Sequence, residues 1–349
     1  MEKSKTSRIE TLDWLRGLMA LSIMFYHLTI WIVAPQDSSS PLGRLGVYGV
    51  SIFFVLSGLS MAIVYNRFIN SIISSIKFFV RRIFRILPLM IVATTLVILP
   101  ELLRTGTTDW RLYILNITTF FGFIEPTSYI PVGAWSIGNE MVYYALTPVI
   151  IFCYNYRLWA GNILFLISLG IGLLFAFHFM KTDMSISDQW ALYVNPFNNL
   201  FLYVMGIAIF YNFREIKIST ALNFTVLIIA VLLFCFLPYK GNQMAIVSGH
   251  GRVVFIILSF IIVLCFYKLN IRLPGFLSIT LETFGMATYG VYLVHPIVYY
   301  YVVTMMNKLN IQGDAMIYGF VAAITIITSI LSYKFFELKM IKLGKKLSA

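Results

Sequence analysis

The feature that most constrains the fold is a series of continuous apolar runs, each about 20 residues long, which is the length needed to cross a bilayer as a helix. The chain has 349 residues, is 60% hydrophobic and only 11% charged, and its mean hydropathy is +0.86. These values lie far from those of soluble globular domains. The runs also lack the period-two alternation of barrel strands. The sequence therefore predicts an all-α fold, a polytopic membrane helix bundle.

About ten transmembrane helices are predicted from the positions of these runs. The stretch at residues 110–123 is too short for a further crossing and is expected to be interfacial or re-entrant. No linker divides the chain, so a single integral-membrane domain over residues 1–349, with a core at about 9–338 and no appended soluble domain, is expected. The predicted spans are 12–34, 47–66, 83–103, 133–155, 158–180, 191–212, 219–238, 249–268, 281–305 and 315–336.

The charge distribution predicts the orientation of the bundle. The chain has 26 Lys and Arg against 14 Asp and Glu, a formal net charge of +12. With an even number of crossings, most basic residues share one side with both termini, including Lys3, Lys5, Arg8 and the tail KFFELKMIKLGKKLSA. Basic residues concentrate on the cytoplasmic side, so both termini are predicted to be cytoplasmic. Topology and membrane lipids then account for the charge, and no nucleic acid partner is expected.

The cysteines predict neither disulfides nor a metal site. Cys153, Cys235 and Cys265 occur singly within apolar runs, without the spacing of metal ligands. We interpret them as packing residues.

Three ionisable residues interrupt the first apolar run, LDWLRGLMALSIMFYHL at residues 12–28. Arg16 and His27 share a helix face because eleven residues make about three turns plus 20°, with a rise of about 16 Å. Asp13 is placed to pair with Arg16, or the two form a snorkelling pair at the membrane surface. His27 is too deep to be interfacial and is expected to face the bundle interior or a water-filled cavity. A structural histidine bonded to a neighbouring helix is the alternative.

A side chain that pairs with His27 should lie at the same depth in the membrane. Glu140, in GAWSIGNEMVYYAL, lies about seven residues below the outer end of its span when counted from Gly133. We therefore expect an acid-base pair in which Glu140 orients the His27 ring. The alternative is that Glu140 satisfies a buried Trp or Tyr donor. Asn195, Asn198 and Asn199 are open to two interpretations, sugar contact or interhelical hydrogen bonding.

Five segments in a fixed order carry a family resemblance: LDWLRGLMALSIMFYHL at 12–28, VSIFFVLSGLSMA at 50–62, FFVRRIFRILPLM at 78–90, GAWSIGNEMVYYAL at 133–146 and FGMATYGVYLVHPIV at 284–298. Together they resemble the membrane acyltransferase family 3 along nearly the whole chain. Its most specific element is the spacing of Arg16 and His27. Two departures are evident, since Met141 follows Glu140 where many members have a second acidic residue, and the closing motif at Glu337 lacks its proline.

The resemblance implies an enzyme, an O-acetyltransferase of the bacterial cytoplasmic (inner) membrane. Its donor would be cytoplasmic acyl-CoA, most simply acetyl-CoA. Its acceptor would be a hydroxyl of an extracytoplasmic or lipid-linked carbohydrate of the cell envelope, such as O-antigen, capsule or exopolysaccharide. The alternative is a transporter or flippase of a lipid-linked glycan without acyl-transfer chemistry.

The implied site residues fall into three groups. The catalytic group has His27 as general base or covalent acyl carrier, with Glu140 and Arg16. Arginine's planar fork suits phosphate, although a basic run between spans is also a plain topology signal. The cofactor-binding group is Arg81, Arg82 and Arg85, and the substrate-binding group is Trp135, Tyr289, Tyr292 and His295. His295 precedes Pro296, so it either lines the same cavity or patches a broken helix.

Overall fold

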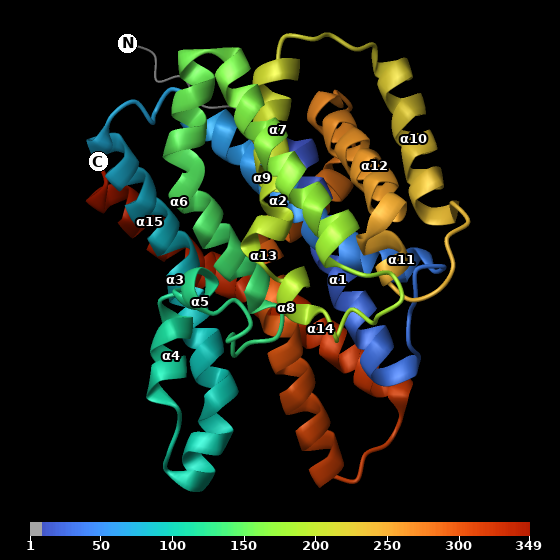
Figure 1. The fold of residues 1–349 in the computed structure, drawn as a ribbon. Coiled ribbons are helices and arrows are strands. Elements are labelled where there is room, and N and C mark those ends of the chain that lie inside the picture. Colours follow the sequence, from blue (N-terminus) through green and yellow to red (C-terminus); the bar gives the residue numbers. More distant parts are fainter. Residues whose placement is uncertain (1–8) are drawn as a thin grey trace.

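The computed structural model describes residues 9–349, and within them every regular element is a helix (Figure 1). Three short π-helical turns, η1 to η3, continue or join longer helices. The elements are α1 (Glu10–Leu28), η1 (Thr29–Val33), α2 (Pro41–Tyr65), α3 (Ile72–Thr105), α4 (Trp110–Ile117), α5 (Phe121–Ile124), α6 (Ala134–Tyr156), α7 (Leu158–Leu174), η2 (Phe175–Phe179), α8 (Trp190–Tyr193), α9 (Pro196–Phe213), α10 (Thr220–Phe236), α11 (Met244–Val247), α12 (Gly249–Lys268), α13 (Gly275–Lys308), α14 (Asp314–Ser332), η3 (Tyr333–Glu337) and α15 (Leu338–Leu347).

The helices make this a multi-pass membrane protein. Within residues 9–349, 8 helices are long and apolar enough to cross a membrane, each over a predicted span. The two other predicted spans are also helical, as α10, a shorter apolar helix, and α13, although neither is among these 8. The count of ten and the cytoplasmic termini stay predictions. Lys3, Lys5 and Arg8, which entered the charge argument, lie outside the described residues.

The segment at 110–123 folds into two short helices, α4 and α5, in line with a piece that does not cross the membrane. They have 8 and 4 residues, whereas a crossing needs about 20. Thr119, between them, has left-handed backbone geometry with a φ of 61°. Asn116 then ties the following loop to α4, donating to the Ser128 carbonyl at 2.8 Å and accepting from the Ile130 amide at 2.7 Å. This loop covers the start of α6, which matters for the site.

Helices α1 and α13 run parallel and in register. Gly17 lies against the backbone of Gly285, and ten residues further along each helix His27 contacts His295. Trp31 and Tyr299, four residues beyond, are again paired, with ring centroids 4.8 Å apart. Small residues let membrane helices approach closely, so the glycine contact brings the two histidine-bearing ends together.

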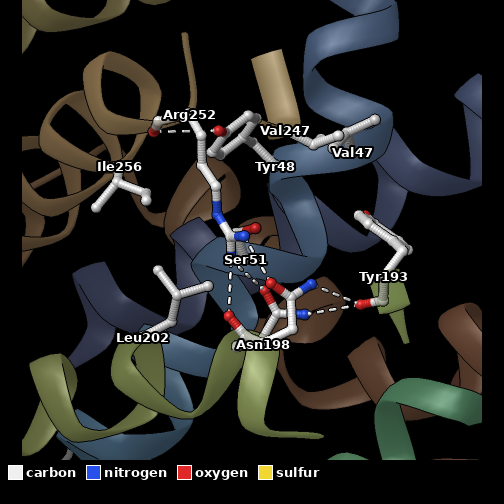
Figure 2. Close-up of a pocket in the computed structure, with 10 residues that line it drawn as sticks. Val47, Tyr48, Ser51, Tyr193, Asn198, Leu202, Val247, Arg252 and Ile256 are labelled. Carbon is white, nitrogen blue, oxygen red and sulfur yellow. Dashed lines mark hydrogen bonds between the residues drawn. The ribbon is translucent and has the colours of Figure 1, made fainter. Parts of the chain in front are cut away.

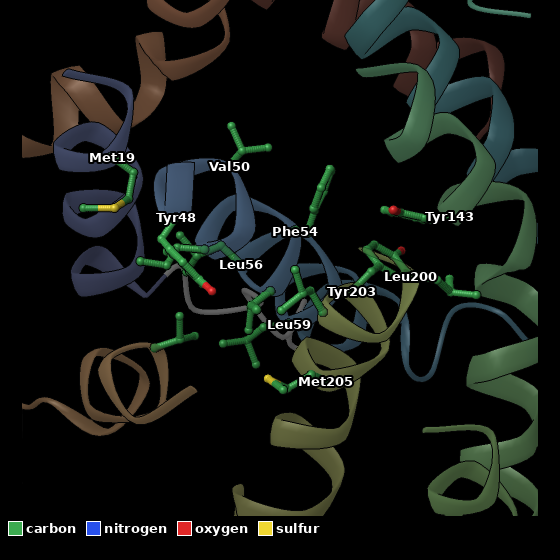
Figure 3. Packing of buried hydrophobic residues seen from close by; sticks show 14 of the residues in the cluster. Met19, Tyr48, Val50, Phe54, Leu56, Leu59, Tyr143, Leu200, Tyr203 and Met205 are labelled. Carbon is green, nitrogen blue, oxygen red and sulfur yellow. The ribbon is translucent and has the colours of Figure 1, made fainter. Parts of the chain in front are cut away.

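Glycines also set the centre of the core, where α2 crosses α9. Gly58 lies against the backbone of Tyr203, and Gly206 lies against the backbone of Val55. Figure 3 shows Leu56, Leu59, Tyr203 and Met205 interdigitating around this crossing. The side of the bundle formed by α2, α9, α10 and α12 is therefore closely packed.

The C-terminal tail forms α15, an amphipathic helix docked along the first part of α3 (Figure 1). Gly344 fits against the Phe84 side chain. Arg81 Nε donates to Ser348 Oγ at 2.8 Å, and Lys77 Nζ donates to the Ala349 carbonyl at 2.6 Å. The tail is thus part of the folded bundle beyond the last predicted span.

Candidate active site

A cavity of about 450 Å³ lies among α1, α2, α3, α6, α13 and α15. Its volume falls in the range of small-molecule sites. Most of the predicted site residues contribute to its walls. The polar residues that line it are Asp13, Arg16, Ser57, Ser60, Tyr65, Arg82, Arg85, Ser136, Glu140, Tyr144, Thr288, Tyr289, Tyr292, Tyr333 and Lys345.

Arg16 lines the cavity as part of a hydrogen-bonded group. It forms the expected ion pair with Asp13 at 2.8 Å, one helical turn earlier. The same guanidinium donates to Ser60 Oγ and, at 3.3 Å, to the Leu56 carbonyl of α2. About a quarter of its side chain remains exposed, 26%. The interaction with α2 and the cavity position go beyond a snorkelling role at the membrane surface.

Two of the three arginines expected to bind the donor line the cavity. Arg82 donates to Tyr65 Oη at 2.8 Å, and Arg85 pairs with Glu337 at 3.2 Å. The Nε of Arg82 is buried and has no hydrogen-bond partner in the described part of the chain. Arg81 instead holds Ser348 and lies over the Phe68 ring. The difference follows from the helix, because adjacent residues point about 100° apart, whereas residues three apart share a face.

Glu140 accepts hydrogen bonds from two hydroxyls in the cavity wall. Ser57 of α2 donates to its carboxylate, and so does Tyr144, one turn along α6, at 2.6 Å. The expected bond to His27 is not present among residues 9–349, where His27 is bound to His295. The alternative interpretation, in which Glu140 satisfies a buried tyrosine, describes the observed contacts.

The two residues lie at different levels along the bundle. Tyr292 Oη lies 2.8 Å from Ser136 Oγ and donates to the Gly133 carbonyl at 2.9 Å, so the first turn of α6 is level with Tyr292. Glu140 is one turn further in, about 6 Å, while the histidine pair is nearly one turn further out, about 4.5 Å. Counting residues from Gly133 as a surface position therefore misplaced Glu140 by roughly 10 Å.

Trp135, which was expected to bind the substrate, does not line the cavity. It is 6% exposed and packs in an aromatic cluster with Trp190 and Tyr193, at centroid distances of 6.1 and 5.4 Å. Trp135 is buried because the segment preceding α6 and the short helix α8 cover the start of α6. Trp135 therefore supports the cavity wall from behind.

The histidine pair has a defined arrangement of protons when both rings are neutral. His295 Nδ1 lies 2.9 Å from the Val291 carbonyl, which only accepts, so this nitrogen carries a hydrogen. Its Nε2 then has a lone pair and accepts from His27 Nδ1, also at 2.9 Å. This leaves the lone pair of His27 on Nε2. The alternative interpretation, in which His27 is a structural histidine bonded to a neighbouring helix, is therefore compatible with a basic Nε2 on the same ring.

The surroundings of the pair fix the ring planes. Trp31 stacks on His27 with centroids 5.0 Å apart and an interplanar angle of 8°. His295 is 1% exposed, whereas His27 is half-buried. The arrangement can therefore hold one imidazole rigidly and present the other.

Tyr289 and Tyr292 line the cavity, and His295 follows Tyr292 nearly one turn further along α13. Tyr289 Oη donates to the Ile86 carbonyl of α3 at 2.9 Å. Tyr292 lies between the cavity and the histidine pair, 6.0 Å from the Phe53 ring and 6.5 Å from the His295 ring, by centroids. Three residues of the late motif therefore form a line from the cavity to His27.

No role was predicted from the sequence for Arg252, which lies near the start of the predicted span 249–268. Figure 2 shows its guanidinium directed at the start of α9, where it donates to Asn198 Oδ1 at 2.6 Å and to the Asn198 carbonyl at 2.7 Å. Asn198 and Asn199 also donate to the Tyr193 carbonyl, and Asn195 caps α9. Interhelical hydrogen bonding, and not sugar contact, thus describes Asn198 and Asn199. The available signal was an arginine beside the apolar run after Gly251.

Comparison with known proteins gives the family. Residues 9–334 match the acyltransferase 3 family, described as an acyltransferase domain. The O-acetyltransferase OatA of Staphylococcus aureus (strain NCTC 8325 / PS 47) is 25% identical over 383 residues, which cover 99% of this chain and 59% of the relative. The putative O-acetyltransferase SACOL0978 of S. aureus (strain COL) is 26% identical over 385 residues, covering 98% and 59%.

The chain spans about three fifths of the length of these curated relatives. No solved structure matches it. The family match covers the chain up to Lys334, which includes the histidine pair and the cavity apart from its α15 wall, and it confirms the resemblance found in the motifs. The chain belongs to the acyltransferase 3 family.

Proposed function

We propose that this protein is an O-acetyltransferase that transfers an acetyl group from acetyl-CoA to a hydroxyl of an extracytoplasmic or lipid-linked carbohydrate. The observation that carries the proposal is the placement of a histidine pair, in which His27 keeps its lone pair on Nε2, about one turn beyond a cavity lined by cationic side chains. The relatives named O-acetyltransferases support the reaction class.

The cavity suits the phosphorylated end of the donor. Arg16, Arg82 and Arg85 supply guanidinium groups that bind phosphate in a bidentate manner. A charged nucleotide does not cross hydrocarbon, so the cationic end of the cavity faces the cytoplasm in the proposal, together with α15. The protein then lies in the bacterial cytoplasmic membrane with both termini inside.

The chemistry uses His27 as a general base. Its Nε2 accepts the proton of the acceptor hydroxyl while that oxygen attacks the acetyl carbonyl carbon. The carbon–sulfur bond breaks, and the proton passes to the departing CoA thiolate. His295 acts as a positioning residue, because its lone pair holds the His27 hydrogen on Nδ1. The competing version forms an acetyl-His27 intermediate first.

Two side chains separate the cavity from His27, so the thioester needs a path. Tyr292 and Phe53 stand in edge contact at this point. Rotation of Tyr292 breaks its contacts with Gly133 and Ser136 and opens the route. Glu140 acts one level further in, where it orients the hydroxyls of Ser57 and Tyr144 along the donor path.

The test is acetyl transfer by purified protein in liposomes, with radiolabelled acetyl-CoA and glycan extracts. We expect labelled glycan from the wild type and loss of transfer in His27→Ala at equal abundance and folding. Label retained on the protein without acceptor, and absent from His27→Ala, would identify the covalent version. Translocation of a glycan while acetyl-CoA stays intact would instead support the transporter alternative and overturn the proposal.

A further inference from the structure

We infer that Lys345 of α15 binds the nucleotide phosphates of the donor, and that α15 forms the cytoplasmic wall of the cavity. This inference rests on the proposed function, since it names a further contact for the same donor. It begins from position, because Ile341 and Lys345 are the residues of α15 that line the cavity. They are four apart and therefore lie on one face of the helix.

The position of α15 is set by contacts at its end. Gly344, directly before Lys345, fits against Phe84, where a larger side chain would collide. Ser348 and Ala349 are held by Arg81 and Lys77 of α3. Lys345 is consequently held beside the cavity by structure on both sides of it. Arg81, a predicted phosphate ligand, therefore holds the end of α15 in place.

The charge balance of the cavity favours a polyanion. Its lining has four cationic side chains, Arg16, Arg82, Arg85 and Lys345, and the two carboxylates Asp13 and Glu140. Arg16 and Arg85 have carboxylate partners, at Asp13 and Glu337. In the part of the chain that the structure describes, the ammonium of Lys345 forms no ion pair. Its charge is thus available to a ligand.

The exposure of Lys345 fits a contact at the cavity mouth. The residue is exposed, whereas Arg82 and Arg85 lie deeper between α3 and the neighbouring helices. A long, flexible ammonium side chain reaches a phosphate as a point charge. We therefore place the nucleotide end of acetyl-CoA against Lys345 and the thioester arm toward Tyr289 and Tyr292.

The experiment compares two donors on matched variants. Competition binding in detergent would measure the affinity for acetyl-CoA, which carries the nucleotide phosphates, and the affinity for S-acetylpantetheine, which lacks them. The variants are Lys345→Ala, Lys345→Glu and Lys345→Arg, with Lys342→Ala as control because Lys342 is exposed on the same helix but does not line the cavity. Melting temperatures confirm that the variants are folded.

We expect Lys345→Ala to weaken acetyl-CoA binding about tenfold. Lys345→Glu should weaken it further, Lys345→Arg should restore it, and S-acetylpantetheine and Lys342→Ala should show no change. At about 1 M salt, the differences in acetyl-CoA affinity between the wild type and the Lys345 variants should become smaller, because the Debye length then falls to about 3 Å.

Two failures are distinguishable. Wild-type protein that binds no acetyl-CoA would overturn the proposed donor and, with it, the Lys345 contact. Wild-type binding that persists unchanged in Lys345→Glu, or an equal loss for both donors, would overturn the Lys345 contact alone.

Discussion

The cavity side of the bundle and its packed side treat buried arginine differently. On the packed side, Arg252 is 4% exposed and Arg44 is 1% exposed. On the cavity side, the side chains of Arg16 and Arg85 are 26% and 25% exposed and each pairs with a carboxylate. Arginine side chains are thus fully buried on the packed side and partly exposed on the cavity side.

The packed arginines are bound by neutral oxygens. Arg44 donates to the carbonyls of Ser38, Phe234 and Leu237, at distances between 2.5 and 2.9 Å. Two of these belong to the end of α10, where the helix leaves carbonyls without partners and carries a partial negative charge. The void beside Arg252 is about 10 Å³, room for little more than a water molecule. The comparison teaches that packed arginines stabilise helix ends, whereas cavity arginines remain able to bind an anion.

The largest expected effect separates catalysis from stability on the cavity side. His27→Ala removes the proposed base, so acetyl transfer should fall about 10²- to 10⁴-fold. The melting temperature in detergent should stay near that of the wild type, because the ring is half-buried and its main partners are His295 and Trp31. Transfer rates and thermal melting of the same preparation check this. If the transfer rate and the melting temperature both fell strongly, His27 would have a structural role.

The next effect belongs to the packed side. Arg252→Met leaves the oxygen of Asn198 buried without its donor, which should lower the free energy of unfolding by about 3 kcal/mol. Transfer per folded molecule should be unchanged, since Arg252 lies outside the cavity lining. Thermal melting and transfer normalised to folded protein are the measurements. A stable variant with impaired transfer would remove the distinction between the two sides.

A smaller effect is expected from Arg85→Ala. It removes one of the cavity cations and should raise the Kd for acetyl-CoA about tenfold. Because Glu337 is 2% exposed and would lose its partner, the double variant Arg85→Ala/Glu337→Gln is the matched control for stability. Binding by the double variant should stay weak while its melting temperature recovers. Recovery of binding together with stability would place Arg85 among the structural arginines.

The smallest effect concerns the attachment of α15. Arg81→Ala loses the bond to Ser348, and such partly exposed hydrogen bonds contribute about 1 kcal/mol. Acetyl-CoA binding should weaken by a few-fold without any change for S-acetylpantetheine, as α15 is held less firmly. The competition assay described for Lys345 measures this. A loss as large as that of Arg85→Ala would instead return Arg81 to the direct phosphate ligands.

Much of the fold was predictable because apolar length is a strong signal. The helices over the predicted spans and the non-crossing segment at 110–123 follow from residue counts alone. The pairing of Asp13 with Arg16 was predictable for the same reason, since three residues make nearly one turn.

Depth was not predictable, because it depends on contacts between distant segments. The level of Glu140 follows from where α6 begins, and that is decided by the loop tied to Asn116 and by Tyr292. Arg252 received no predicted role, because no feature of the sequence shows that Asn198 accepts its hydrogen bond. Lys345 lay in a tail interpreted only as a topology signal, and its place beside the cavity arises from the docking of α15 on α3.

The parallel register of α1 and α13 has a consequence for how these two helices tolerate change. Each places its histidine ten residues after the glycine at their close contact. Adding a single residue to either stretch would rotate that imidazole by about 100° and displace it by about 1.5 Å along the axis. The rings would then face different neighbours, and only an equal insertion in the other helix would realign them. Two segments whose histidines are 268 residues apart in the sequence must therefore keep one common length.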